Sequence, residues 1–142
     1  MNIPHVLTGI GFNRRVLTFE DFENICTELG VKVFFTNEAS EGLFFHRRGH
    51  PIIVLNKNLS GFMLLFIAWH ELAHYLLHPP MLRYFAKGTI KKIEAEANDI
   101  ALCCVIPLPA LKKILALGTS EDWLYPKEFM SRRCELYTRS GN

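Results

Sequence analysis

The sequence lacks the cysteine patterns that mark disulfide frameworks and cysteine zinc sites. It contains four cysteines but no CxxC pair: Cys103 and Cys104 are adjacent, whereas Cys26 and Cys134 stand alone. Such spacing gives no reason to expect a structural metal held by thiolates or a disulfide-rich fold. We therefore interpret the four cysteines as reduced thiols in the protein interior.

Long hydrophobic runs and a signal peptide are also missing. The longest apolar stretch, residues 62–69, ends at a histidine and a glutamate, whereas a membrane-spanning helix needs about 20 apolar residues. Residues 1–10 do not show a basic region followed by an apolar one, as a signal peptide would. These two absences predict a cytoplasmic protein.

Charge and composition are not extreme either. The formal net charge is only +2, which gives no electrostatic argument for binding nucleic acid or a membrane surface. Hydrophobic residues make up 49% and charged residues 21%, as in globular proteins, and no repeat or low-complexity tract is present. A chain of 142 residues is the usual size of one domain, so we expect a single domain over residues 1–142.

The first half of the chain predicts one helix followed by strands. Thr18 and Asp21 have the spacing of a capping box, and apolar residues at helical spacing follow over residues 19–29, up to Gly30. Three β-branched or aromatic segments predict strands over residues 31–35, 42–46 and 51–55, with a hairpin turn at residues 47–50. We expect these strands to form a small antiparallel sheet.

The second half of the chain predicts helices. Ser60 is a suitable N-cap for a helix over residues 61–77 that is apolar on nearly all sides until His70 and should cross the core. Further helices are expected over residues 89–105, 108–117 and 127–138, with Pro126 near the start of the last. A helix, then strands, then helices is the order of the α+β class.

The expected central helix carries His70-Glu71-Leu72-Ala73-His74, an HExxH pattern. Residues four apart share one helix face, so both imidazoles can bind one zinc ion. Glu71 is rotated by about 100° from His70 and can take a proton from a water molecule beside the metal. A chance occurrence is the weaker interpretation, because ionisable residues are rarely buried unless they are paired or bind a metal.

A catalytic zinc site typically has three protein ligands. His78 continues the same face, but it lies about 6 Å beyond the second histidine along the helix axis; we interpret it as a solvent-facing helix end. Glu94 and Glu96 are the better candidates, and they cannot both face the metal. Asn98 shares the face of Glu94 and could orient a ligating histidine, which favours Glu94. The sequence leaves two alternatives open: Glu96 is the third ligand, or both glutamates simply lie on a solvated, charged helix face.

These segments together resemble the ImmA/IrrE family of metallopeptidases from about Thr18 onward. The resemblance rests on HELAHYLLH at residues 70–78, EAEAN at 94–98 and the apolar run at 101–107, with weaker similarity at 52–56 and 125–133. The chain departs from the family pattern at Ala73, at Ile100 and at residues 103–106. The replacements are small or apolar, so they affect packing rather than the metal site.

The resemblance implies a zincin-like fold in which His70, His74 and Glu94 hold zinc and Glu71 is the general base. It also implies a protein substrate, since such enzymes cut a helix-turn-helix transcriptional repressor and release genes for stress response or for mobile-element excision. We expect a repressor, an antitoxin or another regulator to be a separate protein, with no direct contact to nucleic acid or membrane. The alternative is a non-catalytic zinc-containing module that sequesters such a partner.

Several further residues have open roles. Tyr75, Tyr84, His46 and His50 are candidates for stabilising an oxyanion, and the sequence does not choose among them. A substrate bound as an extended strand would use a sheet edge, and residues 51–55 are our hypothesis for that edge. The simplest interpretation of the paired basic residues is a solvated face, and it applies to Lys91-Lys92, Lys112-Lys113 and Arg132-Arg133.

Overall fold

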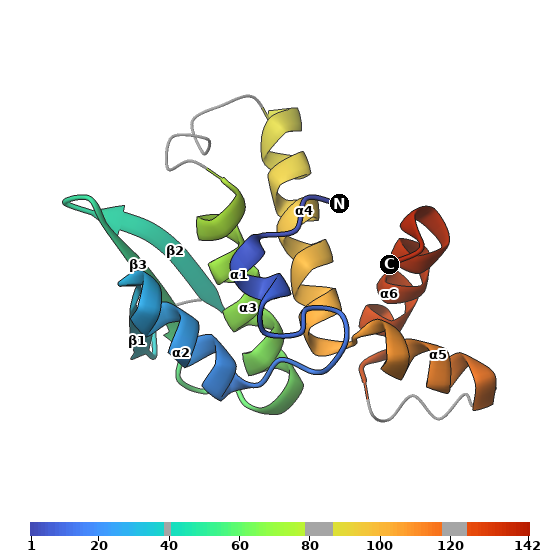
Figure 1. Ribbon diagram of the computed structural model, residues 1–142. Helices are drawn as coiled ribbons and strands as arrows, with labels where there is room; N and C mark the ends of the chain where they lie inside the picture. Colours follow the sequence, from blue (N-terminus) through green and yellow to red (C-terminus); the bar gives the residue numbers. More distant parts are fainter. Residues whose placement is uncertain (39–40, 79–86, 118–124) are drawn as a thin grey trace.

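The computed structural model describes residues 1–38, 41–78, 87–117 and 125–142 (Figure 1). The elements of these residues are α1 (His5–Thr8), α2 (Phe19–Leu29), β1 (Lys32–Thr36), β2 (Gly42–Arg47), β3 (His50–Asn56), α3 (Gly61–Leu77), α4 (Lys87–Val105), α5 (Leu108–Leu117) and α6 (Lys127–Ser140). This is the α+β class that the sequence predicts. In Figure 1 the sheet lies to one side of α3, and α4, α5 and α6 lie to the other.

The three-stranded sheet is mixed, so the expectation of a wholly antiparallel sheet was wrong for one strand pair. β2 and β3 form the expected hairpin. Its turn residues, Arg48 and Gly49, have φ angles of 52° and 79°, the left-handed conformation that tight hairpin turns require. β1 pairs with β3 in parallel. The strand order is β1-β3-β2, so β2 lies on the far side of β3 from β1.

This strand order also corrects the hypothesis about the substrate-binding edge. Residues 51–55 belong to β3, which is the central strand and has no free edge. Ile53 and Leu55 are fully buried there. The free edges of the sheet are β1 and β2, and α3 packs against β2 and β3.

α3 runs through the core, as its composition predicts. Its residues 66–73 are all buried, and α4 packs along it. Trp69 has no exposed surface, and its indole N–H donates a hydrogen bond of 3.1 Å to the carbonyl of Leu17. The ring of Phe22 contacts Trp69 edge-on at 5.8 Å, which holds α2 against the same helix.

The helix boundaries follow local signals. The capping box at the start of α2 is present, with the Asp21 N–H donating to Thr18 Oγ1 at 3.1 Å, and Gly30 ends the helix at φ 74°. α2, α3 and α5 span the predicted residues, whereas α4 begins at Lys87 and α6 ends at Ser140. Pro79, Pro80 and Gly118, residue types that commonly end helices, follow α3 and α5 in the sequence and lie outside the described residues.

None of the described helices is by itself long and apolar enough to cross a bilayer. α4 and α5 satisfy length and composition only as a pair, and that pair is bent by 71°.

Three of the four cysteines lie in the interior as predicted, whereas Cys134 is only partly buried. One basic residue also departs from its predicted position. All four thiols are free, and three are buried: Cys26, Cys103 and Cys104. Arg132 and the two lysine pairs are exposed, but Arg133 is fully buried, so its assignment to a solvated face was wrong. Arg133 Nε donates to the Ile106 carbonyl at 2.7 Å, and its terminal nitrogen donates to Asn13 Oδ1 at 3.0 Å.

Candidate metal centre

Two histidines of α3 direct their imidazoles to one face of the helix. His70 and His74 are four residues apart, and their Nε2 atoms lie 3.2 Å from each other. Their side chains are only 11% and 14% exposed. Two ring nitrogens that converge in a largely buried position are typical of metal ligands.

α4 brings a carboxylate to the same point. Glu94 Oε2 lies 3.1 Å from Nε2 of His70, and Glu94 Oε1 lies 3.0 Å from Nε2 of His74. One ligand atom from each of the three residues can be chosen so that all lie within 4.8 Å of one another. Tetrahedral zinc with bonds of roughly 2.0–2.1 Å would hold its ligand atoms about 3.3 Å apart. The donor set of two imidazoles and a carboxylate therefore fits a zinc ion with little rearrangement.

The second glutamate of α4 is directed elsewhere. Glu96 Oε1 lies 3.9 Å from Nε2 of His78, and Glu96 is not part of the converging group. The structure thus groups Glu94, and not Glu96, with the two histidines. That these residues bind a metal stays a prediction.

His78 is not the solvent-facing helix end that we expected. It caps the C-terminus of α3, and its side chain is only 9% exposed. Its Nδ1 lies 3.4 Å from Nδ1 of His74, on the side of that ring opposite to Nε2. Burial, followed by the neighbouring His74, lowers the pKa of His78, which favours the neutral imidazole. A neutral His78 suits a partner that orients the His74 ring.

The protein groups are charged in a way that suits cation binding. Hydrogen bonds from His70 and then from His74 hold the pKa of Glu94 far below its usual range. Burial alone would lower the pKa of His70, but the hydrogen bond to Glu94 and the charges of Glu71 and Glu94 outweigh it and raise the pKa. Glu94 is therefore an anion. It would attract a metal cation that replaces the protons in its hydrogen bonds with His70 and His74.

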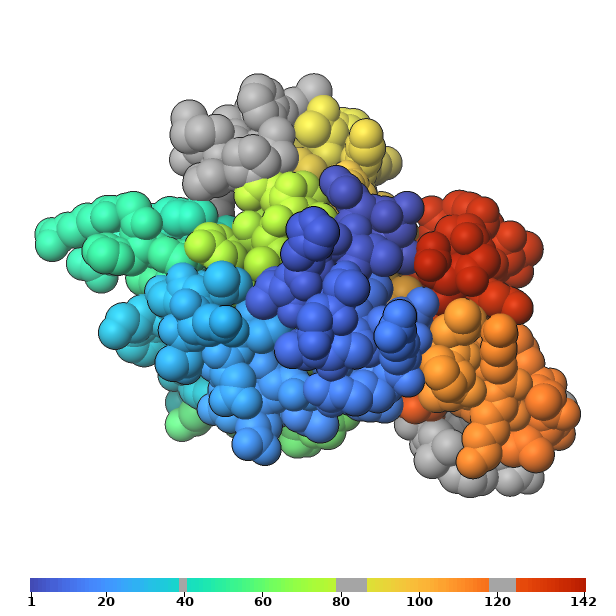
Figure 2. All heavy atoms as spheres, in the orientation of Figure 1, coloured from blue at the N-terminus to red at the C-terminus, as the bar shows by residue number. Residues whose placement is uncertain are grey.

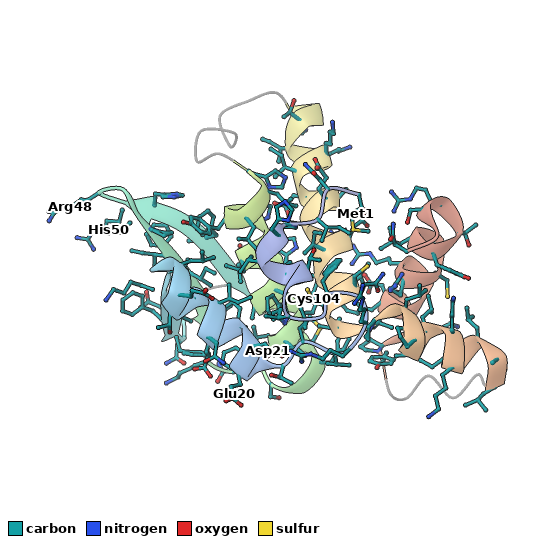
Figure 3. The ribbon with its side chains drawn as sticks, in the orientation of Figure 1. Met1, Glu20, Asp21, Arg48, His50 and Cys104 are labelled. Carbon is teal, nitrogen blue, oxygen red and sulfur yellow. The ribbon has the colours of Figure 1, made fainter. Side chains whose placement is uncertain are left out.

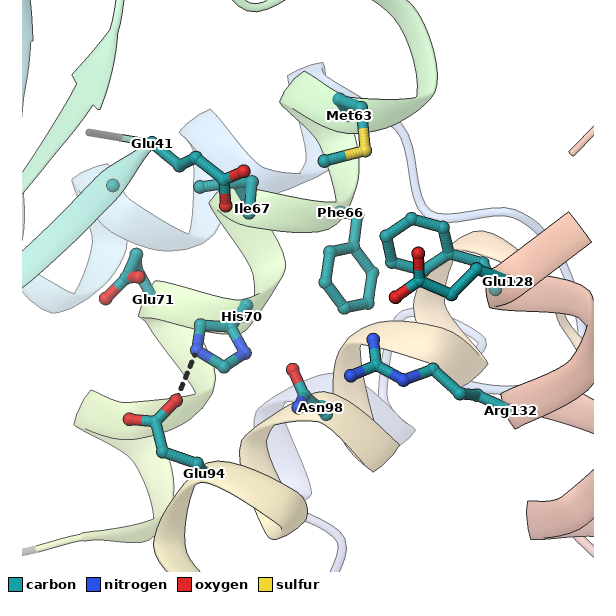
Figure 4. Close-up of a pocket in the computed structure, with 12 residues that line it drawn as sticks. Glu41, Met63, Phe66, Ile67, His70, Glu71, Glu94, Asn98, Glu128 and Arg132 are labelled. Carbon is teal, nitrogen blue, oxygen red and sulfur yellow. Dashed lines mark hydrogen bonds and ion pairs between the residues drawn. The ribbon is translucent and has the colours of Figure 1, made fainter. Parts of the chain in front are cut away.

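Glu71 lies between α3 and the edge strand β2. It is 8% exposed, and burial raises the pKa of its carboxyl, an effect that His70 and His74 oppose. A Cβ atom on Gly42 of β2 would lie 3.1 Å from Cγ of Glu71 and 2.6 Å from Cγ2 of Ile67. Only glycine permits this close approach. In Figure 4 the carboxylates of Glu71 and Glu94 lie on the same side of the His70 ring.

A cavity of about 500 Å³ opens beside these side chains (Figure 4). This volume lies within the range of sites that bind small ligands or side chains. His70, Glu71, Glu94 and Asn98 form its polar part, and its apolar wall comes from α3 and α6: Met63, Phe66, Ile67 and Phe129. The candidate metal position therefore adjoins space for a substrate.

Three charged residues at this cavity were not identified from the sequence. Glu41 precedes β2, and Glu128 and Arg132 belong to α6. The guanidinium carbon of Arg132 lies 5.7 Å from the centroid of the Phe129 ring. Arg132 is exposed, as expected of a solvated residue, yet it also lines the cavity. No sequence signal marks these residues, because tertiary packing brings them to the site: that of α6 for Glu128 and Arg132, and that of the sheet against α3 for Glu41.

The described candidates for stabilising an oxyanion do not line the cavity. His46 and Tyr75 contact each other, with ring centroids 6.0 Å apart, and His50 is exposed at the tip of the hairpin. None of the three is among the cavity residues. Tyr84 lies outside the described residues.

The role expected of Asn98 is met only in part. Asn98 lies on α4 beside His70 and contributes to raising the pKa of that histidine. Nδ1 of His70, however, has no hydrogen-bond partner among the described residues. The amide is therefore placed near the ring without holding Nδ1 in a defined hydrogen bond.

Comparison with known proteins identifies similarity over most of this architecture. Residues 26–132 match the family model described as Peptidase_M78, IrrE N-terminal-like domain, a family of metallopeptidases. A segment of 70 residues is 31% identical to "Uncharacterized immunity region protein 2" of Bacillus phage phi105. That match covers 46% of this chain and 44% of the phage protein, so the chain spans less than half the length of this relative.

Proposed function

Because this chain belongs to the IrrE N-terminal-like family of metallopeptidases, we propose that it is a zinc-dependent endopeptidase that cleaves a regulatory protein. In this proposal zinc is held by His70, His74 and Glu94, and Glu71 is the general base. The observation that carries it is the convergence of two histidines and Glu94 beside an open cavity. A purely structural zinc site usually has four protein ligands and adjoins no such space.

Each side chain has a defined task in the proposed reaction. Zinc, when bound, supplies a Lewis acid that polarises the substrate carbonyl and makes water more acidic. Glu71 accepts a proton from the attacking water and donates it to the leaving amine. Burial raises the pKa of Glu71, which makes its carboxylate a stronger base for this step. Glu94 and the two histidines stay in place, because α3 and α4 pack against each other along the core.

The substrate would bind in extended form along β2. β2 is a free edge of the sheet, and its first residue, Gly42, lies against Glu71 and lines the cavity. Main-chain hydrogen bonds to a sheet edge are a common way to hold an extended peptide. This assignment replaces the sequence-based hypothesis that β3 provides the edge.

The proposed substrate is a regulatory protein. The phage relative is named as an immunity-region protein, which supports a role in control rather than in digestion. We propose a separate protein, such as a helix-turn-helix repressor or an antitoxin, as the substrate, and the cytoplasm as the place of cleavage. A stress-response role would follow from the genes that such a repressor controls.

The proposal is tested with Glu71→Gln in the full chain, co-expressed with a helix-turn-helix regulator chosen as the candidate substrate. Zinc content should be unchanged, because Glu71 is not one of the proposed ligands, while cleavage should fall at least about 100-fold through loss of the acid–base group. Glu96→Gln is the matched control and should cleave normally. Undiminished cleavage by Glu71→Gln contradicts the mechanism. A regulator that binds tightly and stays intact with the wild-type protein instead supports a sequestering module.

A further inference from the structure

The face of the sheet that points away from the helices carries a continuous apolar surface. By strand register, Phe34, Val54 and Leu43 lie side by side across the three strands, and Ile52 and Phe45 form the adjoining row. Phe34 is 53% exposed and Leu43 is 50% exposed, and the other three side chains are partly exposed. On the opposite face Ile53 is fully buried, although Phe35 on the edge strand β1 is 50% exposed. We call the five outward side chains the outer apolar face: Phe34, Leu43, Phe45, Ile52 and Val54.

The helices that cover the sheet contact its other side. Phe44, which points inward, has its ring centroid 5.6 Å from that of Tyr75 on α3. Phe35, also inward by register, lies 6.3 Å from the Phe19 ring of α2. Neither α2 nor α3 therefore covers the outer apolar face. Large apolar side chains exposed together on adjoining strands mark an interaction surface, unlike single ones scattered over a protein.

One end of this face is basic. β1 and β3 begin where β2 ends, so Lys32, Arg47 and His50 come together beside Arg48 of the turn. All four are exposed, and none forms an ion pair within 4.0 Å among the described residues. Figure 3 shows Arg48 and His50 at the tip of the sheet, and in Figure 2 this hairpin projects from the body of the molecule. An acidic partner would neutralise this group.

We propose that the outer apolar face binds an amphipathic helix of a partner protein, with acidic residues toward Lys32, Arg47, Arg48 and His50. Neighbouring strands lie about 4.8 Å apart, so three strands give a surface about 10 Å wide, close to the diameter of one helix. Apolar residues at positions i, i+3, i+4 and i+7 of such a helix would cover the five apolar side chains. Leu43 directly follows Gly42, whose side of the strand faces the cavity, so the outer apolar face and the cavity lie on opposite faces of β2.

The experiment uses the full chain and two synthetic helical peptides with the same leucine pattern. One peptide carries glutamates and the other lysines at the flanking positions, and binding is followed by fluorescence anisotropy at low ionic strength. The glutamate peptide should bind at least about tenfold more tightly, and added salt should weaken it. Leu43→Asp should reduce this affinity at least about tenfold by placing a charge in the apolar contact. The double variant Lys32→Glu, Arg47→Glu should reverse the preference between the peptides.

The matched control is Leu115→Asp on α5, a leucine that is 48% exposed and far from the sheet in sequence. It should bind the glutamate peptide like the wild type, and thermal unfolding verifies that every variant is folded. Equal affinity for both peptides, or equal losses in Leu43→Asp and Leu115→Asp, overturns the proposal. The proposal is also overturned if the wild-type protein is a dimer that Leu43→Asp dissociates. It is likewise overturned if the wild-type protein binds phosphatidylserine vesicles more tightly than the glutamate peptide. Peptidase activity does not enter these measurements, so they do not depend on the proposed function.

Discussion

At the scale of single residues, the proposed ligand set depends on which of two neighbouring glutamates faces α3. Glu94→Ala should weaken zinc binding at least about 100-fold, because the loss of even an outer partner of a metal ligand costs 10–100-fold. Glu96→Ala should change the affinity only a few-fold, because Glu96 lies toward His78. Competition with a chromogenic zinc chelator measures both. The assignment is wrong if Glu96→Ala loses more affinity than Glu94→Ala.

Gly42 of β2 lies so close to α3 that a side chain of even one carbon atom does not fit there. A methyl group at this position would come within 2.6 Å of Ile67 and 3.1 Å of Glu71, so either β2 or α3 must shift. Gly42→Ala should lower the free energy of unfolding by about 1–3 kcal/mol, as overpacking does. It should also slow cleavage by displacing Glu71. Denaturant unfolding and a cleavage assay measure the two effects.

Gly88 is the matched control for this prediction. It lies in the first turn of α4, where an added Cβ meets nothing within 4 Å. Gly88→Ala should stabilise the protein by up to about 1 kcal/mol, because alanine is the better helix former. Similar effects of the two substitutions would show that the contact of Gly42 with Glu71 is not a constraint.

At the scale of elements, the capping box of α2 supports the helix that packs against Trp69. Thr18→Ala removes the oxygen that accepts the Asp21 N–H and should cost about 1 kcal/mol of stability. Thermal or urea unfolding tests this loss. Glu23→Ala, an exposed change in the same helix, should alter stability by less than about 0.5 kcal/mol.

The same cap gives a direction for the pH dependence of stability. The hydrogen bond from Arg15, and then those from Thr18, lower the pKa of Asp21. The pKa of Asp21 is therefore lower in the folded protein than in the unfolded chain. Its contribution to the free energy of unfolding is complete above the unfolded pKa and is lost as the pH falls through the folded pKa. Asp21→Asn should therefore flatten the decline of stability in acid. An unchanged acid profile would contradict this role of Asp21.

Helix boundaries were largely predictable from the sequence, whereas the sheet was predictable only in part. Gly30 and the capping box are local signals, and they define both ends of α2. The hairpin was predictable for the same reason. The parallel pairing of β1 with β3 joins residues far apart in sequence, and no local signal specifies which strand lies in the centre.

At the scale of the whole molecule, Arg133 joins distant parts of the chain. It donates hydrogen bonds to Ile106 at the end of α4, to Asn13 in the N-terminal region and to the carbonyl of Asn142. Arg133→Met should destabilise the protein by about 3 kcal/mol or more, because the buried Ile106 carbonyl loses its donor and the hydrogen bonds from the charged guanidinium to Asn13 and Asn142 are lost as well. Arg132→Met, at an exposed site, should change stability by less than about 0.5 kcal/mol. Equal losses in the two variants would contradict this role.

Some residues of the candidate site could be predicted from local sequence patterns, whereas others depend on the packing of distant elements. His70, Glu71 and His74 are grouped by the periodicity of one helix, so they could be identified from the sequence. Glu94 required an argument about helix faces and the family resemblance. Glu41, Arg132 and the buried position of Arg133 depend on how α6 and the sheet pack around α3 and α4, which no periodicity reveals.

In the proposed site, His70, His74 and Glu94 hold one zinc ion between α3 and α4. The most direct test of this site is the metal content of the full chain, purified without chelator and measured by inductively coupled plasma mass spectrometry. The proposed site predicts about one zinc per chain in the wild type and almost none in His74→Ala. Folded wild-type protein with less than about half an equivalent of zinc would contradict it.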